Sequence, residues 1–173
     1  MEYSHVIHLT SSMKTLRYIF LLVLIVSAGL SAANGQTTAK DKKAAKAAEL
    51  KKNIEAKSFT FVADQMLPQG GGTKILTSEY DLRSTGDSVI SFLPYFGRAY
   101  FDVGYNTDSG IKFTSTKFDY NLKEQKGGWQ ITIKPHDAKN IQSLVLNVSA
   151  NGYASLSVTS VNRDYISFYG YMK

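Results

Sequence analysis

Residues 118–134 read FDYNLKEQKGGWQITIK, and this stretch decides the fold class. Its first part alternates Phe, Tyr and Leu with Asp, Asn and Lys, and its second part alternates Trp129, Ile131 and Ile133 with polar residues. An apolar side chain at every second position is typical of a strand with one buried and one solvent-exposed face. Gly127-Gly128 lies between the two parts and indicates a turn. The stretch therefore predicts two antiparallel strands joined as a hairpin.

The same pattern extends in both directions along the chain. We expect about eight strands and a ninth near the end: 58–64, 73–82, 87–93, 98–104, 111–122, 129–134, 143–149, 153–160 and, last, 165–171. Asn151-Gly152 is a strong hairpin signal, because both central positions of a type I′ turn need positive φ. Short connections between successive strands predict an antiparallel meander. The fold class is all-β, either a small barrel or a two-layer sandwich, in one domain over residues 58–173.

A helical leader precedes the predicted strands. Residues 39–57 are rich in Ala, Lys, Glu and Leu and contain neither Gly nor Pro, which predicts a helix. Its apolar stripe, Ala47, Leu50 and Ile54, is narrow. We interpret residues 36–57 as a Lys/Ala-rich helix that is a solvated spacer. The alternatives are docking of one helix edge on the β domain and a basic helix that binds a surface.

The N-terminal residues have the order of an export signal. A basic stretch from Lys14 to Arg17 is followed by an apolar run over 18–26 and by small residues up to Gly35. The apolar run is shorter than the roughly 20 residues that a membrane-spanning helix needs. We interpret residues 1–35 as an upstream extension plus a secretory signal peptide that starts at Met13. The mature chain is expected to begin near Gln36 and to contain no transmembrane segment.

Cysteine and charge narrow the compartment and the partners. The chain has no Cys, so we expect an exported, soluble protein rather than one anchored through a lipidated N-terminal Cys. Its net charge is +6, but residues 40–57 hold seven Lys against three carboxylates. Residues 58–173 carry 11 basic and 10 acidic side chains and are nearly neutral. Because a nucleic-acid interface needs basic charge clustered on the folded domain, we expect no nucleic-acid partner.

Catalytic and metal-binding patterns are weak. After residue 35 the chain has one histidine, His136, which argues against most zinc sites. Asp137 follows it directly, and adjacency in sequence is not the geometry of a catalytic relay. The glycines at 70–72 lack the spacing of a phosphate-binding loop. We therefore expect no catalytic residues, no metal site and no cofactor.

The densest group of aromatic residues lies at 92–101, which we call the aromatic corner. Exposed Tyr, Phe and Arg are typical of binding hot spots. One interpretation is a turn between strands whose rings fill the core, and the other is a ligand or partner site. The candidate binding residues are Tyr95, Phe96, Arg98 and Tyr100. The tail at 165–171 has the same two interpretations, and a third is that it is a terminal strand that closes the edge of the barrel.

One modification site is also a hypothesis. Asp87-Ser88-Val89 lies at a predicted turn. It is similar to the Asp-Ser/Thr-apolar acceptor that Bacteroides-type bacteria use for O-glycosylation of exported proteins. Ser88 is the residue that would carry the sugar.

Several segments in combination resemble the domain of unknown function 4251 family, which consists of exported proteins of Bacteroides-type bacteria. They are SFLPYFGRAY at 91–100, GIKFTS at 110–115, GGWQITIKP at 127–135, NGYASL at 151–156, NR at 162–163 and ISFYG at 166–170. The resemblance covers the chain from about Lys40 to its end. It implies a Gram-negative periplasmic or outer-membrane-facing location, and it supplies no activity and no catalytic residues.

These observations lead to one expected function and two alternatives. We expect an exported, periplasmic, non-enzymatic β domain that binds a ligand or associates with the cell envelope. Its partner would be a small apolar ligand or an envelope protein. A lipocalin-like carrier with an apolar ligand inside the barrel is the first alternative, and a hydrolase is the second.

Overall fold

The computed structural model describes residues 39–98, 100 and 110–173, and residues 43–173 form one unit. The predicted export signal lies outside the described residues. The elements are α2 (Ala39–Glu55), β1 (Ser58–Pro68), β2 (Lys74–Thr85), β3 (Val89–Leu93), β4 (Ile111–Ser115), β5 (Phe118–Gln125), β6 (Gly128–Pro135), β7 (Ile141–Ser149), β8 (Tyr153–Ser160) and β9 (Ile166–Met172). Strands β5 and β6 follow the alternation of residues 118–134, as predicted.

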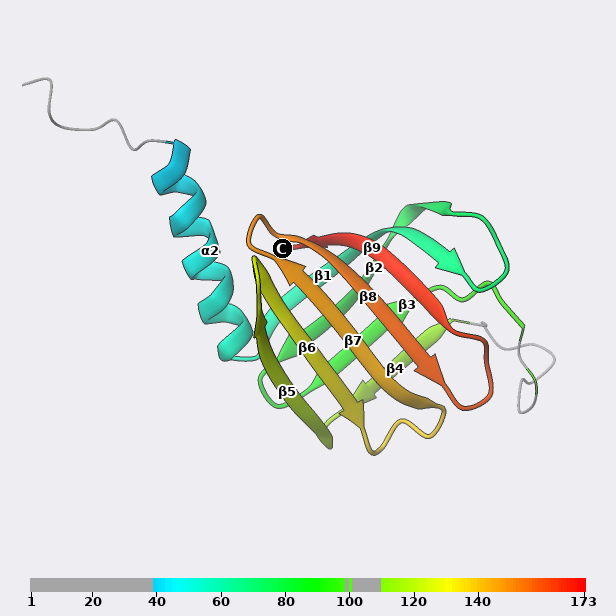
Figure 1. Ribbon diagram of the computed structural model, residues 1–173. Helices are drawn as coiled ribbons and strands as arrows, with labels where there is room; N and C mark the ends of the chain where they lie inside the picture. Colours follow the sequence, from blue (N-terminus) through cyan, green and yellow to red (C-terminus); the bar gives the residue numbers. More distant parts are fainter. Residues whose placement is uncertain (1–38, 99, 101–109) are drawn as a thin grey trace, which may run out of the picture. The chain divides into compact units, whose positions relative to one another are not determined.

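The strands of the described residues belong to one antiparallel sheet, in which nine strands follow the order β4-β3-β2-β1-β9-β8-β7-β6-β5. Neighbours in the sheet are also neighbours in sequence, except for β1 and β9, whose pairing includes Phe61 opposite Met172. Figure 1 shows the sheet curling so that β2, β3 and β4 lie behind β6, β7 and β8. The sheet is thus a nearly closed barrel, and its two edges are β4 and β5. The barrel form of the predicted all-β meander is confirmed.

The inward faces of the strands meet in a hydrophobic core. On β6, Trp129, Ile131 and Ile133 are buried, whereas the residues between them are half-buried. Such burial removes apolar surface from water, and each large side chain contributes about 1.5–3 kcal/mol. The largest fully buried side chains are Ile54, Phe61, Met66, Leu82, Leu93, Ile131, Ile133, Leu144, Leu146, Leu156, Ile166 and Phe168.

Strands β1 and β9 approach each other closely at one point. A Cβ on Gly170 would lie 1.9 Å from the backbone oxygen of Val62, so only glycine fits there. The register of β1 shifts between Ala63 and Gln65, beside this contact. Small inward residues lie next to the glycine, because Ala63 and Ala154 are its partners on β1 and β8. This row of small side chains allows the strands to curve around the end of the barrel.

The prediction of one strand over 111–122 is wrong. The structure has β4 and β5 there, separated by Thr116 and Lys117. The carboxylate of Asp137 accepts hydrogen bonds from the backbone N–H of Thr116 at 2.9 Å and of Lys117 at 3.3 Å. This turn carries the chain from one edge strand of the sheet, β4, directly to the other, β5.

The predicted strand over 98–104 is not found at the residues of this range that the structure describes. Arg98 and Tyr100 lie outside any strand, and 101–104 lie outside the described residues. Strand β3 instead pairs directly with β4, with Val89 opposite Ser115. The segment between these strands begins at the aromatic corner.

Helix α2 docks on the barrel with its C-terminal end. Ile54 has no exposed surface, Leu50 is buried, and both belong to the core cluster. The solvated-spacer interpretation is therefore wrong for this end, and the alternative of an edge docked on the domain is correct. Lys57 follows the helix with a φ of 55°, and its carbonyl oxygen accepts hydrogen bonds from the Ser84 hydroxyl at 2.6 Å and from Gly86 N–H at 2.9 Å. These bonds fix the joint between the helix and β1.

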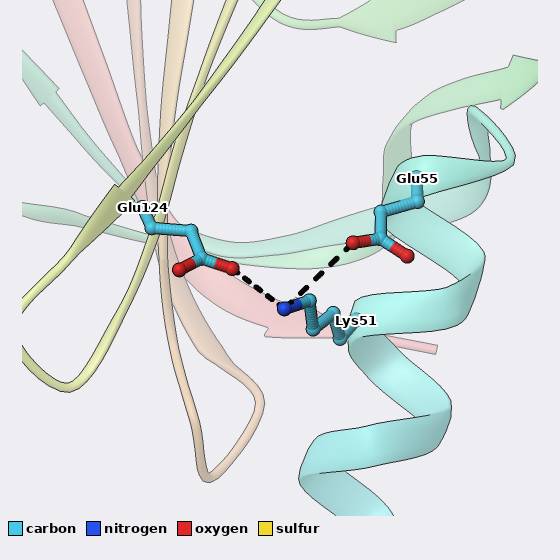
Figure 2. A network of polar contacts seen from close by, with 3 residues as sticks. All are labelled: Lys51, Glu55 and Glu124. Atoms are coloured by element: carbon cyan, nitrogen blue, oxygen red, sulfur yellow. Dashed lines mark hydrogen bonds and ion pairs between the residues drawn. The ribbon is translucent and has the colours of Figure 1, made fainter.

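An ion pair also links α2 to strand β5. Figure 2 shows the Lys51 ammonium between Glu55, at 3.8 Å, and Glu124, at 2.6 Å. The hydrogen bond and charge of Glu124 raise the pKa of Lys51. All three side chains are exposed, so water screens the pair and its main effect is on orientation. In the described ranges, none of the helices has the length and hydropathy needed to cross a membrane.

Candidate binding site

The outward positions of β6, β7, β8, β9 and β1 form rows across the sheet. The middle row is Gln130, Asn147, Ser155, Tyr169 and Gln65. The row on one side is Gly128, Ser149, Tyr153, Tyr171 and Val62. The row on the other side is Thr132, Val145, Ser157, Ser167 and Leu67. We call these residues the uncharged face.

The composition of this face is unusual for the chain. None of its residues is Asp, Glu, Lys or Arg, although these make up 20% of the sequence. The surface of a small soluble domain is commonly about 25–35% charged, with both signs interspersed. Here the side chains are hydroxyl, amide, aromatic or aliphatic. A broad surface of this kind is suited to contact with an uncharged partner.

A groove of about 400 Å³ lies at one end of the uncharged face, and we call it the tyrosine groove. Tyr153 is 69% exposed and Tyr169 is 45% exposed, and both line it. Beside the two tyrosines the lining is low, because Gly128 has no side chain and Ser155 has a small one. Trp129 also lines the groove. The tyrosine groove therefore forms because large tyrosine side chains stand next to small residues.

Polar groups in the groove are ordered by neighbouring residues. The Gln130 side-chain N–H donates to the Asn147 amide oxygen at 3.0 Å. Each amide has two N–H donors and one acceptor oxygen, so this bond leaves donors on Asn147 and an acceptor on Gln130. The Ser149 hydroxyl donates to the Tyr153 carbonyl oxygen at 2.7 Å and holds the hairpin turn that presents Tyr153. In that turn Gly152 has a φ of 93° but the φ of Asn151 is not positive, so the turn is not of the predicted type I′, which needs positive φ at both central positions.

The candidate residues of the aromatic corner divide into buried and exposed ones. Tyr95 is 6% exposed and belongs to the core cluster. Its hydroxyl donates to the Arg98 carbonyl oxygen at 2.7 Å, and the Arg163 guanidinium lies 5.0 Å from its ring. Burial raises the pKa of Tyr95, and the carboxylate of Asp164 adds to this. Tyr95 thus holds the corner together from within.

Phe96, Arg98 and Tyr100 are exposed. The ammonium of Lys74 lies 5.0 Å from the Phe96 ring. The Tyr100 hydroxyl donates to the Asp164 carboxylate, and this hydrogen bond raises the pKa of Tyr100.

The corner is tied to the loop between β8 and β9. Asp164 N–H donates to the Arg98 carbonyl oxygen at 3.1 Å, and Tyr100 N–H donates to that of Asn162 at 2.9 Å. This loop is at the opposite end of the β8–β9 hairpin from Tyr153, which pairs with Tyr171. The exposed members of the corner therefore form a group separate from the tyrosine groove.

The tail at 165–171 alternates between buried and exposed side chains, and β9 lies between β1 and β8 rather than at an edge of the sheet. Phe168 and Ile166 are in the core, whereas Tyr169 and Tyr171 are exposed. Tyr153 and Asn147 were missed as binding candidates. The period-two pattern that places Ala154 inside the barrel already places Tyr153 outside it. What the sequence lacks is the strand register, which places Asn147 and Tyr169 on either side of Ser155.

The proposed modification site lies in the turn between β2 and β3. Ser88 is half-buried, and its hydroxyl is 2.5 Å from the Thr85 hydroxyl. The Ser88 carbonyl oxygen accepts a hydrogen bond from Thr85 N–H at 3.0 Å. The glycosylation hypothesis for Ser88 stays a prediction.

Acid–base side chains are scattered over the described part of the chain. Within it, no three His, Cys, Asp or Glu side chains gather in a way that could hold a metal ion. His136 Nε2 lies 3.2 Å from the Asp119 carboxylate, with both side chains exposed.

The comparison with known proteins agrees with the fold. Residues 41–172 match the family described as "Domain of unknown function (DUF4251)". The crystal structure of a DUF4251 family protein from Bacteroides eggerthii DSM 20697 is similar, with a TM-score of 0.51 and 15% sequence identity. The similarity covers 75% of this chain and 90% of that one, and at this identity it shows the fold alone. No curated protein matches the chain. Because the family match spans most of its length, the chain belongs to the DUF4251 family.

Proposed function

We propose that the protein is an exported, non-enzymatic binding protein of the bacterial cell envelope, and that the tyrosine groove is its binding site. The order of basic, apolar and small residues over 14–35 supports export. One observation carries the binding role. Tyr153 and Tyr169 are exposed as diagonal neighbours beside small polar residues, on a face without charge.

Exposed tyrosine rings favour ligand binding because they leave apolar surface in contact with water until a ligand covers it. Tyr presents a large, rigid, mostly apolar surface that loses little conformational entropy when a ligand covers it. The hydroxyl and amide groups of Ser155 and Asn147 then supply orientation. A groove of about 400 Å³ is within the size range of small-ligand sites.

Co-sedimentation with isolated cell envelopes tests this function. The purified protein, the double variant Tyr153→Ala/Tyr169→Ala and the control Phe92→Ala are each mixed with envelopes and centrifuged. Phe92 is an exposed aromatic on β3, outside the groove, with 43% exposure. We expect the double variant to stay in the supernatant while the wild type and the control sediment. Equal sedimentation of all three would remove the groove as the binding site.

Two further measurements accompany this experiment. Both tyrosines are exposed, so the double variant should melt within a few degrees of the wild type. Fractionation of native cells tests export, and we expect the protein in the periplasmic fraction. Recovery from the cytoplasm at full length would contradict it.

The barrel also fits the alternative of a lipocalin-like carrier. In the structure the interior is occupied by large side chains such as Phe61, Phe168 and Leu82, none of which has exposed surface. An interior ligand would have to displace them, which makes the outer groove the stronger candidate. An organic extract of the purified protein, analysed by mass spectrometry, separates the two. A lipid present in equimolar amount would favour the carrier.

A further inference from the structure

We propose that the ligand of the tyrosine groove is an uncharged carbohydrate, an inference that rests on the proposed binding function. A pyranose ring has an apolar face of C–H groups and a rim of hydroxyl groups. The groove offers a matching arrangement, with aromatic side chains next to amides and hydroxyls on a face without charge.

The tyrosines provide the surfaces on which sugar rings stack. The face of an aromatic ring is electron-rich, so it attracts the slightly positive C–H groups of a sugar. Tyr169 pairs with Ser155, and Tyr171 pairs with Tyr153, which makes Tyr153 and Tyr169 diagonal neighbours across β8 and β9. Diagonal neighbours in a sheet lie about 7–8 Å apart, so a short oligosaccharide can contact both rings.

The polar lining matches the hydroxyl groups of a sugar. Each sugar hydroxyl both donates and accepts hydrogen bonds. Asn147 keeps its N–H donors, because its hydrogen bond with Gln130 at 3.0 Å uses only its amide oxygen. Ser155 adds a hydroxyl that serves in either sense. The groove therefore offers donors and acceptors beside the aromatic rings.

Other ligand classes fit less well. A nucleic acid or another polyanion needs several cations, whereas the groove lining contains Lys126, and Lys46 near Tyr153 is accompanied by Asp64. An acyl chain would cover Asn147 and Ser155 without hydrogen-bonding them, which is unfavourable. A peptide that adds as a strand needs a sheet edge, whereas β8 is paired on both sides.

Isothermal titration calorimetry tests the inference directly. The protein is titrated with the neutral hexasaccharides of cellulose, amylose, mannan and chitin. We expect at least one of them to give a saturable binding isotherm. Polygalacturonate, which is anionic, serves as the comparison ligand, and preferential binding of polygalacturonate would overturn the proposal.

Variants assign the signal to the tyrosines. Tyr153→Ala and Tyr169→Ala should each weaken binding about tenfold or more, as loss of a hot-spot aromatic does. Tyr153→Phe keeps the ring, so it should bind within about threefold of the wild type. Phe92→Ala should bind as the wild type does. Equal affinity of the wild type and of both alanine variants would overturn the proposal.

Periodate treatment separates this inference from the proposed function. Periodate oxidises vicinal diols and so destroys most sugar rings on isolated envelopes. Tyrosine-dependent co-sedimentation that is lost after this treatment supports a carbohydrate ligand. Co-sedimentation that survives it, with no response to any hexasaccharide, overturns the carbohydrate and leaves the binding function standing.

Two other occupants would also overturn the inference. One is a second copy of this chain, seen as a dimer at high concentration that Tyr153→Ala makes monomeric. The other is a proline-rich peptide that competes for the groove, since such peptides dock in aromatic-lined grooves.

Discussion

The hydroxyl of Tyr120 on β5 donates a hydrogen bond to the backbone carbonyl oxygen of Ile54, near the end of helix α2, at 2.7 Å. The two residues are 66 positions apart in sequence. Burial raises the pKa of Tyr120 well above its usual range, so the phenol keeps its proton and donates throughout the physiological range. This bond ties the helix to one of the two edge strands of the barrel.

Removal of that hydroxyl should loosen the joint without unfolding the barrel. The change Tyr120→Phe deletes one hydrogen bond and keeps the ring. We expect a loss of about 1 kcal/mol in the free energy of unfolding, measured by urea denaturation. The Ile54 oxygen also accepts a bond from Lys57 N–H at 3.0 Å, so it is not left unpaired. A variant as stable as the wild type would show that the Tyr120 hydroxyl forms an equally favourable hydrogen bond with water in the unfolded chain.

The helix itself should contribute to stability through its buried end. Ile54→Ala removes a side chain that has no exposed surface, and we expect a loss of about 2–5 kcal/mol. Lys52→Ala, on the exposed side of the same turn, should stay within about 0.5 kcal/mol of the wild type. Urea denaturation of both variants measures the difference. Similar small effects would restore the interpretation of this segment as a solvated spacer.

The turn between β4 and β5 should make the stability of the fold depend on pH. The Ser115 hydroxyl and the backbone N–H groups of Thr116 and Lys117 lower the pKa of Asp137 to about 2. In the unfolded chain the value is roughly 3.9. The carboxylate therefore stabilises the fold above pH 3.9, and this contribution is lost as the pH falls towards 2.

The variant Asp137→Asn tests this dependence. It lacks the charge at every pH, so its melting temperature should lie below that of the wild type at neutral pH. The gap should narrow below pH 4 and close near pH 2, as followed by circular dichroism. A gap that stays constant over this range would assign the role of Asp137 to shape rather than to charge.

A different kind of constraint operates where β1 and β9 meet. Gly170→Ala would place a methyl group 1.9 Å from the Val62 oxygen, so the backbone must move. We expect a loss of about 1–3 kcal/mol or more, because overpacking between paired strands has no flexible side chain to absorb it. Gly72→Ala, which has no neighbouring atom within 4 Å, is the matched control. Equal thermal midpoints of the two variants would show that the strands separate easily here.

These positions show how far the sequence predicts the fold. Period two in residues such as Trp129 and Ile131 predicted strands and their inward faces, because the pleat places alternate side chains on opposite sides. The end of β4 was missed because it is marked only by a change in which set of alternate positions faces the core. Phe113 and Phe118 both pack on the core, although they are an odd number of positions apart. The turn between them depends on Asp137, which comes from another loop.

The candidate site was only partly predictable, for the same reason. Alternation places Tyr169 outside the barrel, and it does so for Tyr153 as well. The predicted meander already makes β8 and β9 neighbours, but their register, which places Tyr169 opposite Ser155 and diagonal to Tyr153, is not encoded in the local pattern. In the aromatic corner the pattern could not separate Tyr95, which is buried, from Phe96, which is exposed. That distinction depends on how the chain turns after β3.

The aromatic corner gives a final prediction that separates stability from binding. Tyr95→Ala should cost about 3 kcal/mol or more, because it removes a buried ring and its bond to the Arg98 carbonyl oxygen. Arg98→Ala should leave stability within about 0.5 kcal/mol, since the backbone of Arg98, not its exposed side chain, makes that bond. Co-sedimentation with envelopes then decides the role of the exposed residues. A folded Arg98→Ala variant that no longer sediments would make the corner a second binding site, whereas unchanged sedimentation leaves the tyrosine groove alone in that role.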